Sequence, residues 1–147
     1  MAATHFSGPV QAGTKKDADQ TGAANIGSVL LTQTLTLTQN GTTAVTAAFV
    51  LPANSQIVGF NVDTVTAWNS GTSDTLTIGT AAAGSQYVGG VSVATAARAA
   101  ISYTAAELLA MSNIGVNTTV DVTVTPVGTA ATAGTTIVTI EYIQAAQ

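Results

Sequence analysis

The sequence contains no cysteine, which excludes disulfide bonds and thiolate metal sites. Charge is also scarce, because Asp, Glu, Lys and Arg make up 7% of the 147 residues, against about 25% in typical soluble domains. Seven acids and three cations, Lys15, Lys16 and Arg98, give a net charge of −4. Three cations cannot neutralise a run of phosphates or hold an anionic lipid surface. We therefore expect neither nucleic acid nor a membrane as a partner.

Long hydrophobic runs are missing as well. The mean hydropathy is +0.41, but no run approaches the roughly 20 apolar residues that span a bilayer. Residues 1–9 have neither the basic start nor the apolar segment of a secretory signal, so we expect none. A surface with so few charges has little electrostatic protection against association. We expect much of it to be buried against other subunits, although a merely neutral Thr, Ser and Asn surface would have the same composition.

Groups that could carry out catalysis are few. The single histidine, His5, lies in a segment without periodicity, where a Ser-His-Asp site would lack rigid support. Asp17 and Asp19 lack the further oxygen ligands of a calcium loop. The other acids outside the predicted helix are isolated and have the character of solvated strand or turn residues: Asp63, Asp74, Asp121 and Glu141. We expect no enzyme, cofactor or metal site, unless the fold brings two carboxylates together.

Residues 1–27 differ from the rest of the chain. They contain four glycines, one proline and the cluster Lys15-Lys16-Asp17-Ala18-Asp19, and neither helical nor strand periodicity persists. Such a segment cannot bury enough apolar area to offset its ordering entropy. We predict an extended N-terminal arm that orders on a neighbouring molecule, with Phe6 and Val10 as apolar anchors. A frayed tail is the alternative.

Residues 28–147 are predicted to form one β-rich domain. Apolar residues occupy alternate positions over much of this segment, which is typical of strands with one buried face. In the first run Gln33 interrupts the apolar phase and threonines fill the other phase. Eight runs follow one another between turn signals: 28–38, 43–51, 57–68, 75–78, 87–93, 98–103, 120–125 and 137–143. This spacing favours an antiparallel sandwich or barrel.

Turn residues between these runs predict hairpins. Leu51–Thr80 holds two runs joined by Asn69-Ser70-Gly71, which predicts an antiparallel pair. Asn40-Gly41 predicts a second hairpin. Trp68, the only tryptophan, is expected to face the interior because it shares a phase with residues of its own run: Val58, Phe60, Val62, Thr64 and Thr66.

One helix is predicted. Thr104 at the N-cap and Glu107 three residues later form a capping-box pattern. A stop follows after about two turns at Asn113 and Gly115. The apolar side of this helix is predicted to consist of Leu108, Leu109 and Met111.

Several stretches share a pattern of turns and strands with one protein family. They are Ala3-Thr4-His5-Phe6-Ser7-Gly8-Pro9-Val10, Leu51–Trp68, Gly71–Thr80, Val122–Pro126 and Gly128–Gly134 with the last strand. Over most of its length the chain resembles the head decoration, or cement, proteins of tailed bacteriophages. Residues 94–112 are less similar.

The resemblance implies an all-β fold, a jelly-roll-like antiparallel β-sandwich with about eight strands, one short helix and an extended N-terminal arm. It implies a homotrimer seated on the outer capsid surface of the virion, assembled in the host cytoplasm, with the major capsid protein as partner. The arm would contact the shell or a neighbouring subunit. Its expected capsid-binding residues are Thr4, His5, Phe6, Pro9, Val10, Lys15 and Lys16.

A rival hypothesis is a head-fibre or adhesin-like sandwich that recognises host surface glycans. Carbohydrate sites generally need exposed aromatic rings. The candidates are Trp68, Tyr87, Tyr103 and Tyr142. Of these, Trp68 and Tyr142 are expected to lie in the core.

Overall fold

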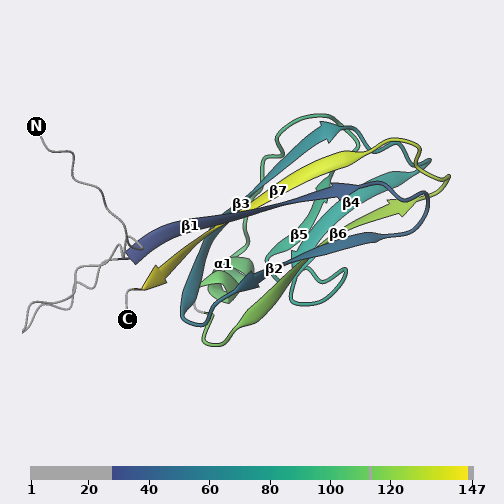
Figure 1. Cartoon of the computed structure of the whole chain (residues 1–147). Helices are drawn as coiled ribbons and strands as arrows, with labels where there is room; N and C mark the ends of the chain where they lie inside the picture. The colour runs from purple at the N-terminus through teal and green to yellow at the C-terminus, as the bar shows by residue number, and fades with distance from the viewer. Residues whose placement is uncertain (1–27, 113, 146–147) are drawn as a thin grey trace, which may run out of the picture.

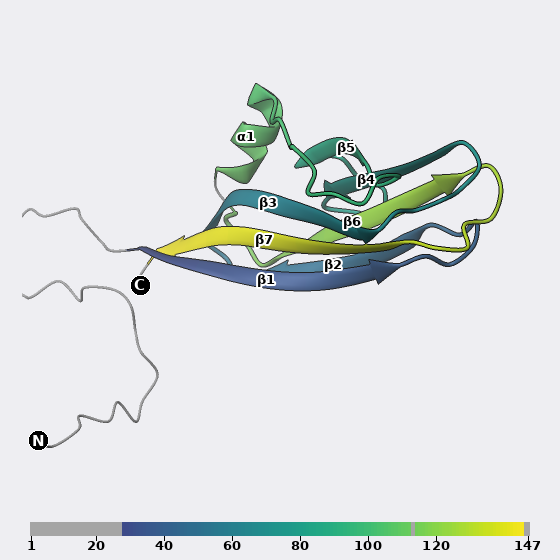
Figure 2. The ribbon, with the colours of Figure 1, turned by 90° about the horizontal axis from the view of Figure 1, so that it is seen from above.

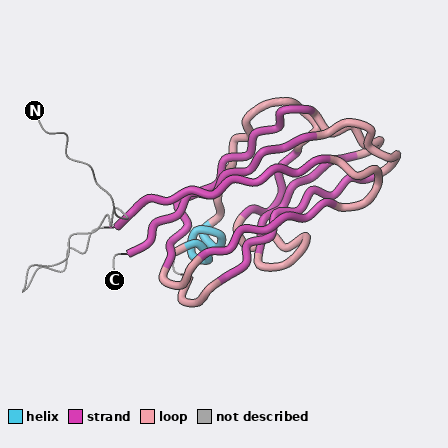
Figure 3. Tube along the Cα trace, in the orientation of Figure 1, coloured by secondary structure: helices cyan, strands magenta, loops and turns pink. Residues whose placement is uncertain are grey.

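The computed structural model describes residues 28–112 and 114–145 (Figure 1). These residues form seven strands and one short helix, traced in Figure 3. In chain order they are β1 (Ser28–Thr38), β2 (Val45–Leu51), β3 (Ser55–Thr66), β4 (Ser73–Gly79), β5 (Val88–Ser92), α1 (Ala105–Met111), β6 (Thr118–Val127) and β7 (Thr135–Ala145). Seven of the eight predicted runs are therefore confirmed as strands.

The strands form two antiparallel sheets that pack against each other. One sheet has the order β1-β7-β3 and the other β2-β6-β4-β5. Figures 1 and 2 show the strands of both sheets running along one long axis, with α1 beside β3 at one end. The predicted all-β, jelly-roll-like sandwich of about eight strands with one short helix is confirmed.

The chain path is that of an eight-stranded jelly roll in which the strand between β5 and β6 is replaced by a short extended segment. β1 to β4 alternate between the two sheets, and β6 and β7 alternate again. In an eight-stranded jelly roll the chain would cross after β5 to a strand beside β3. Residues 97–99 occupy that place: Thr64 N donates to Ala97 O at 3.0 Å, and Ala99 N donates to Val62 O at 2.9 Å.

The strand predicted at 98–103 is therefore wrong, because only an isolated bridge between Asp63 and Arg98 forms. The pairing of residues 97–99 with β3 does not extend as far as Phe60. The hydroxyl of Tyr103 accepts the Phe60 N–H at 2.9 Å, and so takes a backbone donor that a paired strand would have used.

Both predicted hairpins are wrong. β3 pairs only with β7, whereas β4 pairs with β5 and β6 in the other sheet. β1 and β2 are likewise divided between the sheets, although Gly41 has the left-handed φ of +64° that its turn sequence indicates. Alternation of apolar residues shows which face of a strand is buried, but two strands that face each other across a core have the same alternation as two paired strands.

The core between the sheets includes Trp68, as predicted. Its ring is 1% exposed, and its Nε1 donates to the Thr136 hydroxyl at 3.0 Å. Alternate residues of both sheets supply most of the remaining buried side chains: Leu37, Phe49, Leu51, Ile57, Phe60, Val62, Leu76, Ile78, Val88, Val120, Val122, Val124, Val138, Ile140 and Tyr142.

Two residues assigned to the buried phase of β3 are exposed. Val58 is 45% exposed, because the register with β7 shifts between Ile57 and Gly59. A bulge of this kind moves every residue before it to the opposite face, so Ile57 enters the core in place of Val58. Thr66, beyond a second register shift, is exposed as well.

The helix α1 begins as predicted. Glu107 N donates to the Thr104 hydroxyl at 3.3 Å, and Thr104 N donates to the Glu107 carboxylate at 2.7 Å, which completes the capping box. Of its predicted apolar side, only Met111 is buried, whereas Leu108 is 53% and Leu109 75% exposed. A seven-residue helix at the end of a sandwich can bury only one side of its last turn.

Gly134 lies directly against the ring of Trp68. A Cβ at this position would lie 2.6 Å from the ring Cδ2 and 2.7 Å from Cγ, and the backbone φ is +155°. Both features exclude a larger side chain unless the buried ring moves.

We predict that Gly134→Ala lowers the free energy of unfolding by about 1–3 kcal/mol, the usual cost of overpacking a core. Urea unfolding followed by tryptophan fluorescence measures this loss. Gly115→Ala is the matched control, because a Cβ there meets nothing within 4 Å, and its effect should stay within about 0.5 kcal/mol. Equal stability of the two variants would contradict the contact.

Candidate functional site

The seven residues expected to bind a capsid lie outside the described part of the chain: Thr4, His5, Phe6, Pro9, Val10, Lys15 and Lys16. Both lysines are among them. Residues 28–147 carry five carboxylates and one guanidinium, a net charge of −4. A candidate site in the described residues must therefore be built mainly from uncharged groups.

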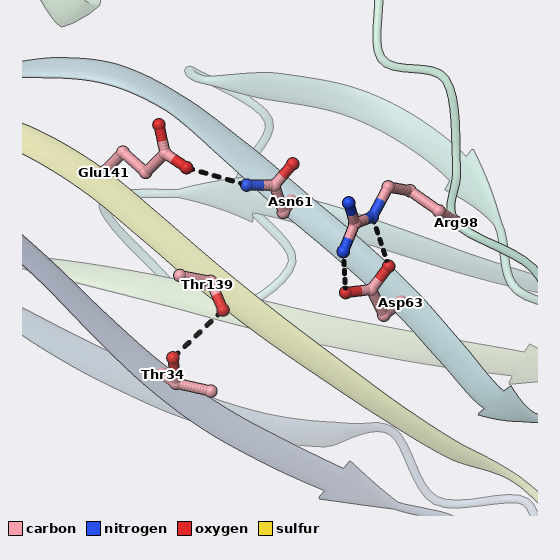
Figure 4. Close-up of polar contacts among 6 residues, drawn as sticks. All are labelled: Thr34, Asn61, Asp63, Arg98, Thr139 and Glu141. Carbon is pink, nitrogen blue, oxygen red and sulfur yellow. Dashed lines mark hydrogen bonds and ion pairs between the residues drawn. The ribbon is translucent and has the colours of Figure 1, made fainter.

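The single guanidinium belongs to Arg98 and is paired with Asp63 (Figure 4). Its Nε and Nη2 donate to the two carboxylate oxygens at 2.6 and 2.8 Å. The expectation that Asp63 is an isolated solvated acid is therefore wrong. The hydrogen bond from Arg98 lowers the pKa of Asp63, and that of Arg98 is raised by the same bond. Both side chains remain partly open to water, at 68% and 32% exposure, so the pair adds little to stability.

Two other acids also have specific partners. Glu141 accepts a hydrogen bond from the Asn61 amide at 2.9 Å (Figure 4). Asp74, predicted to be solvated, is 2% exposed. One of its oxygens accepts the Ser70 N–H at 3.0 Å, whereas Oδ1 has no partner. Asp74 therefore organises the turn before β4 rather than a surface.

Tyr103 connects several of these groups. Burial raises the pKa of its hydroxyl, the hydrogen bond from Phe60 N opposes this shift, and the charges of Glu107 and Glu141 add to it. The carboxylate of Glu107 is already engaged: the backbone N–H of Thr104, above all, lowers its pKa. Glu107 therefore stays ionised as a helix cap, and this cluster offers no free acid–base pair for catalysis.

The outer face of the β1-β7-β3 sheet is lined by hydroxyl groups. Thr32, Thr34, Thr36 and Thr38 are exposed on β1, as predicted. Thr34 lies opposite Thr139 of β7, and their hydroxyl oxygens are 3.0 Å apart (Figure 4). The same face also carries the charged side chains of Glu141 on β7 and Asp63 on β3, so it is uncharged only along β1.

Exposed large apolar side chains gather at one end of the sandwich. We call this set the apolar end: Leu30, Val50, Val58, Leu108, Leu109 and Val116. They lie at the start of β1, the end of β2, the start of β3, on α1 and just before β6. Figure 1 shows these elements meeting at the end where the chain enters β1. Leu30 and Val58 face outward from the β1-β7-β3 sheet, whereas Val50 faces outward from the other sheet. The set therefore surrounds one end of the sandwich, and a partner that covers that end would bury it.

Sequence reasoning missed the apolar end. Its members come from five separate stretches, and Leu108 and Leu109 were expected to face the core. A partial signal was present, because a two-turn helix with Leu108, Leu109 and Met111 cannot bury all three. Which of the three side chains packs into the core depends on how α1 lies against the sandwich.

The aromatic residues considered for glycan recognition are poorly exposed. Trp68, Tyr87 and Tyr142 are 1%, 3% and 6% exposed, which confirms the expectation for Trp68 and Tyr142. Tyr103 is half-buried against the core.

Comparison of the chain with known protein families, curated proteins and solved structures finds no significant match. Among the described residues, no helix is long and apolar enough to cross a membrane. The same residues contain no group of three or more His, Cys, Asp or Glu side chains placed to hold a metal ion.

We predict that Arg98→Gln lowers the melting temperature slightly at pH 7, and that this effect shrinks as the pH falls below 3.8 and Asp63 becomes protonated. The pair depresses the pKa of Asp63 below its ordinary value of 3.8. Its stabilisation is therefore present above that value and disappears as the pH falls through the depressed pKa. Calorimetry of wild type and variant over this range measures the difference.

Asp63→Asn is the control, since it should reproduce the loss at pH 7, and the double variant should lose no more than either single one. Added salt should shrink the difference as well. A difference that persists at low pH would show that packing of the Arg98 stem, and not the ion pair, is responsible.

Proposed function

We propose that this chain is a structural, non-enzymatic virion protein that decorates the outer surface of a tailed-phage head and cements it. The observation that supports this most directly is the apolar end. It places six exposed apolar side chains beside Ser28, where the predicted arm joins the sandwich. Docking through this end would let the arm and the sandwich contact the same neighbouring surface.

The sparse charge of the sandwich supports the same proposal. Burying a charged side chain without a partner costs several kcal/mol, whereas burying an apolar one is favourable. Two charged side chains lie close to members of the apolar end, Glu107 next to Leu108 and Glu141 opposite Gly59, and both already accept hydrogen bonds, from Thr104 and Asn61. A shell protein could therefore cover this surface at little desolvation cost.

Cementing follows from mass action. A protein that binds only the assembled shell adds its binding free energy to the energy that opposes rupture. We propose a homotrimer bound to the major capsid protein, because three linked copies raise the effective concentration of each arm. Weak contacts from Thr4, His5, Phe6, Pro9, Val10, Lys15 and Lys16 would then suffice, and the complete particle would carry the protein on its outside.

The glycan-recognition hypothesis has less support. Three of its four candidate rings are buried, and the fourth is half-buried with its hydroxyl bound to Phe60 N. Stacking on a sugar requires an open ring face. Specific, saturable binding on a glycan array would nevertheless favour it over the decoration role.

We predict that removing residues 1–20 leaves a folded trimer that no longer binds heads. The two sheets enclose a hydrophobic core of their own, so we expect thermal unfolding of the truncated and complete chains to be similar. Co-sedimentation with heads stripped of this protein measures binding. Retention of full occupancy by the truncated chain would refute the role of the arm.

We also predict that Leu109→Glu weakens head binding at least about fivefold, which corresponds to about 1 kcal/mol at 25 °C. The variant places a charge on a side chain that is 75% exposed at the apolar end. Val65→Glu is the matched control. Val65 is 60% exposed near the end of β3, at the opposite end of the sandwich, and its replacement should change the dissociation constant by less than about twofold.

Equal weakening by Leu109→Glu and Val65→Glu would show that added negative charge alone reduces binding. No weakening by Leu109→Glu would remove the apolar end from the interface. Both variants should keep the wild-type melting temperature within a few degrees, because both side chains are largely in water.

A further inference from the structure

The two sheets have four edges, of which two are blocked and a third is partly covered. The edge of β3 is covered by residues 97–99, and Tyr103 takes the Phe60 N–H. β5 has only five residues, two of them glycines, and the Glu107 carboxylate lies against Gly89. Blocking of this kind is how proteins keep sheet edges from pairing with other chains.

The edge of β2 is partly covered by β1. β1 and β2 lie next to each other on the same side of the sandwich (Figure 2). Gln33 on the inner face of β1 donates to the Val50 carbonyl of β2 at 2.9 Å and to the Tyr142 hydroxyl at 3.2 Å. This explains why a polar residue interrupts the apolar phase of β1: it satisfies a carbonyl at the edge of the opposite sheet.

The outer edge of β1 is different. Within residues 28–112 and 114–145, β1 pairs with β7 on one side and with no strand on the other. Its eleven residues, SVLLTQTLTLT, include no charged residue, proline or glycine. Its register with β7 runs without a shift from Ser28 to Thr38. A long, regular and uncharged edge has none of the usual protection against strand pairing.

We propose that β1 pairs edge to edge with β1 of a second copy, in antiparallel orientation across a twofold axis. β1 offers the longest open edge among the described strands, and a second β1 is the partner that matches it in length and in lack of charge. The pairing would join two sheets into one six-stranded sheet, β3-β7-β1-β1-β7-β3.

The side chains of β1 suit this partner. Threonines occupy one face at every second position, so an antiparallel pair places them across from one another. Threonine pairs across strands are favourable, and β1 already makes such a contact with β7 at Thr34 and Thr139. The absence of charge from β1 means that two copies bring no like charges together at this edge.

A twofold contact differs from the threefold contact of a trimer. The pairing does not depend on the proposed function, and it would occur in the purified protein. If the decoration role also holds, β1 pairing would link neighbouring trimers on the shell, and the cement would act as a connected layer.

The chain has no cysteine, so introduced cysteines report this contact cleanly. Three single variants would be made in the full-length chain: Thr32→Cys, Thr34→Cys and Thr36→Cys. Each would be oxidised alone and in an equal mixture with each of the other two. In an antiparallel pair of fixed register, the sequence numbers of the two residues that lie opposite each other add up to the same value along the whole strand. If the cysteine of one copy is moved by two residues, it lies about 6.6 Å further along the strand from its former partner, in addition to the spacing of about 4.8 Å between the strands. The Cα atoms are then more than about 7 Å apart, which is too far for a disulfide. We expect cross-links only in combinations that share one sum.

Thr139→Cys is the matched control. Thr139 lies beside Thr34 on the same face, but one strand further in, so two copies would hold it about 14 Å apart. It should not cross-link. Cross-linking of Thr139→Cys as readily as of the β1 variants, or in β1 combinations with no common sum, would indicate stacking or random collision and would overturn the proposal.

A second measurement uses charge. Thr34→Lys should halve the mass of the complex in solution, measured by light scattering, whereas Thr139→Lys should leave it unchanged. Circular dichroism and the melting temperature verify that both variants fold. An unchanged mass for folded Thr34→Lys, or a wild-type protein that is a monomer at all concentrations tested, would overturn the pairing.

Discussion

The free backbone groups along the sheet edges are the constraint on which the rest of this structure depends. Each N–H and C=O on an edge strand needs a partner in the chain, in water or in another molecule. Residues 97–99 and Tyr103 meet this need for β3, and Gln33 meets part of it for β2. β1 is left with the longest open edge among the described strands, so the fold itself favours this strand for assembly.

The exposed side chains differ between one end of the sandwich and the rest of its surface. Polar, uncharged threonines cover the β1 part of the outer face of the β1-β7-β3 sheet, whereas the exposed apolar residues gather at the end where the chain enters β1. The charges are few and mostly occupied, as the Asp63–Arg98 pair and the Glu107 cap illustrate. This arrangement suits a protein that acts by being held at one end, and it provides no cluster of reactive groups among the described residues.

The candidate site could be predicted only in part. The sequence indicated correctly that Thr32, Thr34, Thr36 and Thr38 face water, and that Trp68 is buried. For the apolar end it held only the partial signal of the helix, because that surface combines residues from β1, β2, β3, α1 and the segment before β6, which are far apart in the chain. It also placed Asp63 and Asp74 in solvent, since the partner of one and the burial of the other arise from contacts between distant segments.

The sequence by itself determined where seven of the strands lie, which face of most of them is apolar, and where the helix starts. These features depend on alternation and on a capping pair within four residues, which are local properties. Only the tertiary structure decided which strands are neighbours, so that both expected hairpins became crossings between sheets and residues 98–103 formed a single bridge. The physical reason is that burial of a strand face is satisfied equally by a partner beside it or by a sheet across the core, and the choice depends on the packing of the whole chain.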